Sequence, residues 1–79
     1  MRALCMIMVK AGKVDSVVEI LRKKRKAAKQ IMIVTGRADI CVMLQGTLDE
    51  LNGMVIDFKK IDNIVATETL MEVEVNLGW

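Results

Sequence analysis

A short polar break between two apolar runs carries side chains suited to holding a small charged molecule. The break is Thr35, Gly36, Arg37, Ala38 and Asp39, between the apolar runs 31–34 and 40–44. An amino acid needs an acceptor for its ammonium group and N–H or O–H donors for its carboxylate. Asp39 supplies the acceptor, and the hydroxyl and backbone N–H groups of the break supply donors. These residue types predict a site for a small zwitterion.

Three further polar residues, Thr67, Glu68 and Thr69, interrupt the last apolar stretch of the chain. Their hydroxyl and carboxylate groups extend the same donor and acceptor set. Each residue also has an ordinary structural explanation, since Thr favours strands and Asp in a turn bonds local backbone N–H groups. The pattern alone leaves the binding and the structural interpretations open.

The break itself predicts a β-hairpin. Two apolar runs joined by a short glycine-containing loop are typical of this motif, here with strands at 30–35 and 39–44. We expect Gly36 to adopt a backbone conformation that other residues resist. The hairpin then places the polar break at an exposed turn.

The rest of the chain predicts two strands and two helices around this hairpin. A continuous apolar run at 3–9 indicates a strand buried on both faces, and 64–75 indicates an edge strand. The first helix carries an apolar stripe at Val14, Val17, Val18 and Leu21 and has the basic run in its last turn. The second helix begins with a capping box at Thr47 and Glu50 and ends at 62–63. Its expected apolar stripe comprises Leu48, Leu51, Val55 and Phe58, with Met54 and Ile61 beside it.

The predicted fold is α+β, a single 79-residue domain of the ferredoxin-like βαββαβ type. Right-handed crossovers place both helices on one face of a four-stranded antiparallel sheet. Two helices cover only one face, although three of the strands read as apolar on both. Because monomers rarely expose an apolar face of several hundred Å², we expect a homodimer with sheets packed back to back.

Several kinds of chemistry lack the residues they need. The chain has no His, no P-loop, no dinucleotide fingerprint and no nucleophile elbow, so we expect a non-enzymatic protein without cofactor or metal. Cys5 and Cys41 lie in apolar runs and are predicted to be reduced and buried, with a disulfide or metal site as the alternatives. No signal peptide or membrane-length apolar run is evident, so a cytoplasmic location is expected.

Half of the cations lie in one run. Six of the twelve Lys and Arg residues fall between positions 22 and 29, against a net charge of +2 for the chain. This run is either a solvated helix end or an electrostatic footprint for nucleic acid. No aromatic residues interleave with it to stack bases, which favours the solvated helix end.

The hairpin loop also carries a family resemblance. Val34–Asp39, VTGRAD, resembles the VTGxxD loop in the effector domain, also called RAM, of the leucine-responsive regulatory protein (Lrp/AsnC) family. The stretches 11–14, 48–51 and 64–70 resemble the entry to helix one, the start of helix two and the last strand of that domain. The four motifs occur in the family's order and span nearly the whole chain.

This resemblance implies a fold, an assembly and a site. It implies a βαββαβ domain of the dimeric α/β barrel type, with dimers joined into octamer or decamer rings. It implies an amino acid or similar effector held between dimers by Thr35, Gly36, Arg37, Ala38 and Asp39, together with Thr67 and Thr69. The family's DNA-binding domain is not recognisable in the chain, so we expect co-assembly with full-length regulators rather than direct DNA binding.

The sequence departs from the family pattern in three places. Ala11 replaces a usual proline, while Arg37 and Ala38 replace loop residues that are often acidic and aromatic. The two loop changes favour a different or more acidic ligand. A barrel enzyme of the small monooxygenase type and a nucleic-acid-binding module stay as alternative functions.

Overall fold

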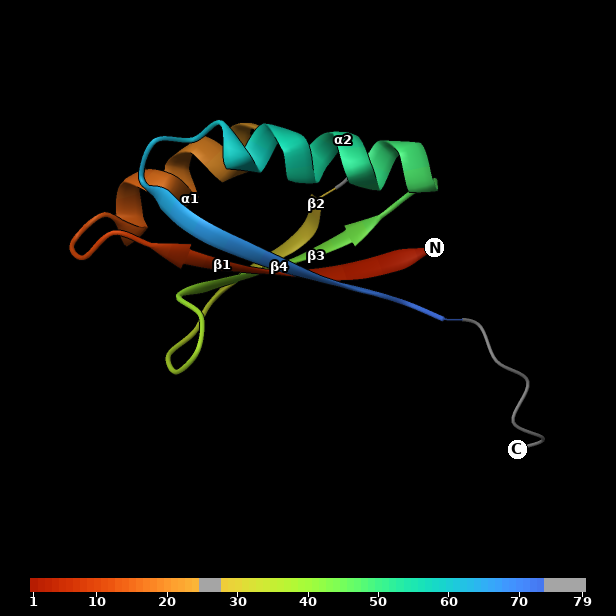
Figure 1. Cartoon of the computed structure of the whole chain (residues 1–79). Coiled ribbons are helices and arrows are strands. Elements are labelled where there is room, and N and C mark those ends of the chain that lie inside the picture. Colours follow the sequence, from red (N-terminus) through yellow and green to blue (C-terminus); the bar gives the residue numbers. More distant parts are fainter. Residues whose placement is uncertain (25–27, 74–79) are drawn as a thin grey trace.

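The chain forms one sheet covered on one side by two helices. A computed structural model describes residues 1–24 and 28–73. Its elements are β1 (Arg2–Val9), α1 (Val14–Lys23), β2 (Ala28–Ile33), β3 (Ile40–Gln45), α2 (Leu48–Lys59) and β4 (Ile64–Met71). Both helices lie on the same face of the sheet (Figure 1). The predicted ferredoxin-like βαββαβ fold is confirmed.

The strand order is β2-β3-β1-β4, and every neighbouring pair is antiparallel. β1 and β3 are therefore the inner strands, and β4 is an edge strand as predicted. β4 ends at Met71, so it is shorter than the predicted 64–75, of which positions 74 and 75 lie outside the described residues.

The hairpin strands are displaced from their predicted positions. β2 covers 28–33 instead of 30–35, and β3 covers 40–45 instead of 39–44. The ladder between them ends at the pair Ile33 and Ile40. Thr35 and Asp39 therefore belong to the loop, and this loop is one position longer at its start than the predicted break.

The first helix matches its prediction closely. Val17, Val18 and Leu21 are buried, and Val14 is partly buried. The last turn contains Arg22 and Lys23, where cations interact favourably with the helix dipole. The remaining predicted helical positions of the basic run, 25 and 26, lie outside the described residues.

The second helix begins as predicted and buries most of its predicted stripe, with Val55 partly buried against the core. The Thr47 hydroxyl accepts the Glu50 backbone N–H at 3.2 Å, and the Glu50 carboxylate accepts the Thr47 N–H at 2.9 Å. The buried stripe is Leu51, Met54 and Phe58, whereas Leu48 is 54% exposed. Leu48 is the first residue of the helix, and the prediction that it joins the stripe is wrong. The helix ends at Lys59, and a turn leads to β4.

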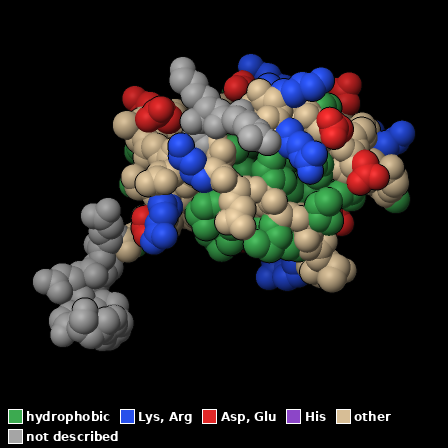
Figure 2. Space-filling view, turned by 180° about the vertical axis from the view of Figure 1, so that it is seen from behind, with side chains coloured by type: hydrophobic (Ala, Val, Ile, Leu, Met, Phe, Trp, Pro, Cys, Tyr) green, Lys and Arg blue, Asp and Glu red, His purple; other side chains and the backbone are tan. Residues whose placement is uncertain are grey.

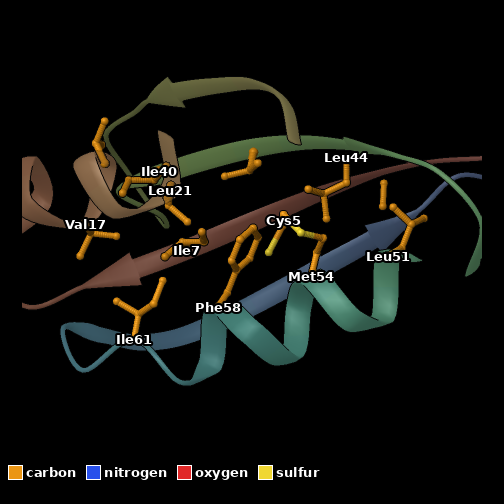
Figure 3. Close-up of a cluster of buried hydrophobic side chains, with 13 residues drawn as sticks. Cys5, Ile7, Val17, Leu21, Ile40, Leu44, Leu51, Met54, Phe58 and Ile61 are labelled. Atoms are coloured by element: carbon orange, nitrogen blue, oxygen red, sulfur yellow. The ribbon is translucent and has the colours of Figure 1, made fainter. Parts of the chain in front are cut away.

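The core lies between the helices and one face of the sheet. Phe58 and Met54 point from α2 toward Ile7 and Cys5 of β1, and Leu51 points toward the sheet nearer Leu44, as Figure 3 shows. Ile40, Val42 and Leu44 supply the same layer from β3 and are fully buried. Burying each such side chain contributes about 1.5–3 kcal/mol. This layer fixes the strands that hold the hairpin loop.

Candidate ligand-binding site

The predicted binding loop joins β2 to β3 on the side of the sheet away from the helices (Figure 1). The backbone N–H of Val34 donates to the carbonyl of Asp39 at 2.9 Å and closes the loop. Gly36 has a φ of +114°, which L side chains rarely adopt, so the predicted special conformation is confirmed. Thr35, Gly36 and Arg37 are exposed, while Ala38 is buried.

Asp39 anchors the end of the loop to β1. Its backbone N–H donates to the carbonyl of Ile7 at 3.0 Å. Its Oδ2 accepts the backbone N–H of Val9 at 2.8 Å in a partly buried position. Oδ2 is therefore engaged within the fold. The turn interpretation of Asp39 named the right kind of bond, but the partner is 30 residues away and is not local.

Thr67 and Thr69 lie elsewhere in the fold. They are paired with Ile7 and Cys5, whose side chains are buried beneath the helices. Side chains of directly opposed residues share a face of the sheet, so both threonines face the helix layer. The Thr69 hydroxyl donates to Cys5 Sγ at 3.6 Å, and burial raises the pKa of this thiol. The loop is on the other side, so one chain does not bring the two parts of the predicted site together.

The sheet face opposite the helices, called the open face below, is largely apolar. It carries Leu4, Met6 and Met8 from β1, Cys41 and Met43 from β3, Met32 from β2, and Ala66 and Leu70 from β4. Figure 2 views the molecule from behind with the sheet nearly edge-on, and hydrophobic side chains gather in the middle of that surface with charged ones around them. The prediction of strands that are apolar on both faces is confirmed.

One end of the open face is hollowed. A depression of about 300 Å³ is lined by Arg2, Ala3, Leu4, Met43, Leu70, Met71 and Glu72. Its rim is an ion pair in which Arg2 Nε donates to Glu72 Oε2 at 3.0 Å. The sequence predicts that the strand at 3–9 is apolar on both faces. It does not predict the Arg2–Glu72 ion pair, because the two residues are 70 positions apart.

The described part of the basic run is exposed near the end of α1. Arg22 and Lys29 line a depression of about 290 Å³ with Ala28, Gln30 and Ile31. Arg22 also approaches Glu19 at 3.8 Å in an i,i+3 pair. The helix end is thus partly balanced by its own acidic residue, and positions 25 and 26 of the run lie outside the described residues.

The described residues hold no cluster of the usual metal-ligating side chains and no membrane-length helix. Within 1–24 and 28–73, no three His, Cys, Asp or Glu side chains are grouped to hold a metal ion. No helix in the same part of the chain is long and apolar enough to cross a bilayer. Cys5 and Cys41 are both free thiols, and only Cys5 is fully buried. They lie on opposite faces of the sheet.

The fold has close matches among solved structures. FFRP-DM1 is 26% identical with a TM-score of 0.82, covering 91% of this chain and 97% of that one. AsnC from E. coli is 22% identical with a TM-score of 0.82, covering 94% of this chain and 51% of AsnC. Both are proteins of the Lrp/AsnC family. The chain has the fold of the Lrp/AsnC effector domain. The family resemblance of the hairpin loop and its flanking elements is confirmed at this level.

A third structure extends the comparison. The protein TTHA0845 from Thermus thermophilus is 19% identical with a TM-score of 0.84, and the match covers 95% of each chain. The effector-domain fold therefore persists where few residues are shared. The chain matches no protein-family model and no curated protein sequence. The fold is thus established by structural similarity.

Proposed function

We propose that this effector-type domain binds an amino acid or related small metabolite, assembles with itself, and acts in transcription regulation without binding DNA directly. The observation that carries the proposal is the anchored hairpin loop, with Gly36 at positive φ and Asp39 tied to β1. The loop presents Thr35, Arg37 and backbone N–H groups on a rigid base. These donors suit a carboxylate.

The proposed site is completed by a second chain. Thr67 and Thr69 face the helix layer and do not reach the loop of their own chain. A ring of dimers, octameric or decameric, would bring another surface against the loop and enclose the ligand. Arg37 at a loop position that is often acidic in the family favours a ligand carrying an additional negative charge.

The first contact in this assembly is a homodimer through the open face. The methionines and leucines of this face would pack against the same residues of a second copy. Sheets packed in this way lie about 10 Å apart, with their side chains interdigitated. The Arg2–Glu72 pair and Glu68 would form a polar rim. Full-length Lrp/AsnC-type regulators could enter the same assembly through the same face.

The dimer is tested by placing a charge on the open face. Met43→Glu should convert the dimer to monomer in sedimentation velocity, because each copy would bury an additional carboxylate among methionines and leucines, and the nearby Arg2 is already paired with Glu72. Ile56→Glu is the matched control, since Ile56 is 56% exposed on α2 and away from the sheet. A wild-type protein that stays monomeric at high micromolar concentration would refute the assembly.

Ligand binding is tested by thermal shift against the twenty amino acids and 2-oxoacids at millimolar concentration. A ligand at ~100 times its Kd stabilises the folded protein by ~2.7 kcal/mol. That corresponds to roughly 10–20 °C for a domain of this size. We expect a hit among acidic compounds, and a flat panel would contradict the sensing function.

Two glycines provide a matched pair for assigning the site. Gly36→Ala and Gly12→Ala both place a side chain at positive φ, at +114° and +77°, with open space around the new Cβ. Both substitutions strain a turn, but only Gly36 lies in the proposed site. The ligand-induced shift should be lost in Gly36→Ala and kept in Gly12→Ala. Equal loss in both, or in neither, would remove the loop assignment.

A further inference from the structure

Three methionine side chains surround Cys41 on the open face. Met6 and Met32 are each directly opposite Cys41 on the two strands that flank β3. Met43 lies two residues along β3, and therefore on the same face as Cys41. The thiol is thus the centre of a cross of three thioethers, called the sulfur cross below. The proposed ligand-binding function makes no use of it.

Strand geometry brings these donors within reach of one atom. Directly opposed residues have Cβ atoms about 4.5–5.5 Å apart, and residues two apart on a strand are separated by about 6.6 Å. The unbranched methionine side chain has three rotatable bonds, so its thioether sulfur can be placed above a neighbouring residue. A metal ion at roughly 2.3 Å from Cys41 Sγ, as in other metal–thiolate bonds, would be accessible to the flanking thioethers.

The surface is also hollowed at this point. A small cavity of about 40 Å³ is lined by Met32, Cys41 and Met43, together with Leu4 and Gln30. Three of the four sulfur residues therefore share one depression. A volume of this size has room for a single ion beside the thiol.

The donor set selects the kind of ion. Thiolate and thioether ligands are soft and favour copper(I), whereas magnesium, calcium and manganese favour oxygen donors. The chain has no His, and no group of three His, Cys, Asp or Glu occurs among the described residues. Zinc would find a single thiolate, with the Gln30 amide in the same cavity and Glu68 opposite Met6, which falls short of the nitrogen and thiolate set of its usual sites. We propose that Cys41, with Met6, Met32 and Met43, binds a copper(I) ion.

Charge balance supports a monovalent ion on this apolar face. On binding, the Cys41 S–H bond breaks, its proton leaves to solvent, and an Sγ–copper bond forms. The thiolate and copper(I) charges cancel, so the product is neutral and avoids the cost of placing a net charge among leucines and methionines. A divalent ion with the same ligands would leave one uncompensated positive charge.

The second thiol of the chain does not form such a site. Cys5 is fully buried on the helix-covered face, where it accepts the Thr69 hydroxyl. Its neighbours there are the aliphatic and aromatic side chains of the core, with Met54 among them. Cys5 is therefore an internal control for the behaviour of a thiol without the cross of methionines.

The copper inference does not depend on the proposed amino-acid sensing. It is also compatible with the proposed dimer, because sheets packed face to face lie about 10 Å apart and an ion close to the thiol fits between them. Its failure would leave the thermal-shift panel and the Met43→Glu experiment unaffected.

The test is an anaerobic copper(I) titration in competition with a chromogenic chelator, with silver(I) as a redox-inert probe in native mass spectrometry. We expect one ion per chain. Because any accessible thiol takes up soft metals, the decisive variant is the double substitution Met6→Leu with Met32→Leu. It keeps side-chain volume and removes two thioethers. Losing outer-shell partners costs ~10–100-fold in metal affinity, so losing two direct donors should cost at least that.

Three control variants distinguish copper(I) binding by the sulfur cross from binding by a thiol alone. Met54→Leu and Cys5→Ser alter sulfur atoms of the core face and should leave copper affinity unchanged. Cys41→Ser should abolish stoichiometric binding in a chain whose circular dichroism stays native. The inference is overturned if the double Met variant binds copper(I) as tightly as the wild type, if Cys41→Ser retains the ion, or if zinc competes equally well.

Discussion

The Oδ2 atom of Asp39 accepts the backbone N–H of Val9 at 2.8 Å and ties the binding loop to the end of β1. The same residue donates its own N–H to Ile7 and accepts that of Val34, so three bonds converge on it. Asp39 thereby joins the loop, β1 and the hairpin closure. The rigidity of the proposed site depends on this residue before any ligand is bound.

Removing this carboxylate should destabilise the fold itself. Asp39→Ala leaves the partly buried Val9 N–H without its partner, at a cost of about 1–3 kcal/mol. Asp39→Asn keeps an oxygen acceptor and should cost less. Urea denaturation of both variants measures the difference. If Asp39→Ala is as stable as the wild type, the bond has no structural role, and any loss of ligand binding would then report on the site alone.

The capping box at the start of α2 should be worth about 1 kcal/mol. Thr47→Ala removes the acceptor for the Glu50 N–H, whereas Thr47→Ser keeps a hydroxyl at the same place. In thermal unfolding a domain of this size should lose roughly 4–8 °C in the alanine variant and little in the serine variant. Equal melting temperatures for Ala and Ser would show that solvent replaces the cap.

Local patterns in the sequence were sufficient to predict the elements. The capping box, the α1 stripe and the positive φ of Gly36 each depend on residues within a few positions of one another, so they could be identified without tertiary contacts. The exposed Leu48 shows the limit of this approach. Leu48 has the spacing of the apolar stripe of α2. However, it is the first residue of the helix and does not join the buried layer.

The site could be predicted only in part because its contacts are long-range. Nothing near Asp39 in the sequence indicates that its partner is Val9. The pairing of β4 with β1 determines which face of the sheet Thr67 and Thr69 occupy, and this pairing includes a register shift at Met8 and Val9. Since a slip of one residue exchanges the two faces of a strand, the chain order alone does not determine which face they occupy.

The two thiols should differ sharply in reactivity. Cys5 is fully buried and burial raises the pKa of its thiol, while Cys41 is half-buried on the open face. If only global unfolding exposes Cys5, a stability of ~5 kcal/mol slows its modification by ~10³-fold or more. Labelling with a thiol reagent, assigned by Cys5→Ser and Cys41→Ser, measures both rates.

Concentration should change only one of these rates. If the open face forms the dimer, Cys41 becomes protected as the protein concentration rises through the dimer dissociation constant, whereas Cys5 is unaffected. In Met43→Glu the Cys41 rate should stay high at all concentrations. A Cys41 rate independent of concentration in the wild type would contradict burial of this thiol between two sheets.

The ion pair at the rim of the open face should contribute to stability only above acidic pH. The Arg2 guanidinium, through its hydrogen bond to Glu72, holds the pKa of that carboxyl below its usual range. A lowered folded-state pKa means that the contribution is present above the usual value of about 4.3 and is lost as pH falls through the folded value. Glu72→Gln should therefore lower the urea midpoint slightly at pH ~7 and not at pH ~2–3. Glu68→Gln, in β4 shortly before Glu72, is the control for a general charge effect. Added salt should reduce the Glu72 difference because the pair is exposed to solvent. A Glu72→Gln effect that persists unchanged at low pH would mean that the side chain acts through packing and not through its charge.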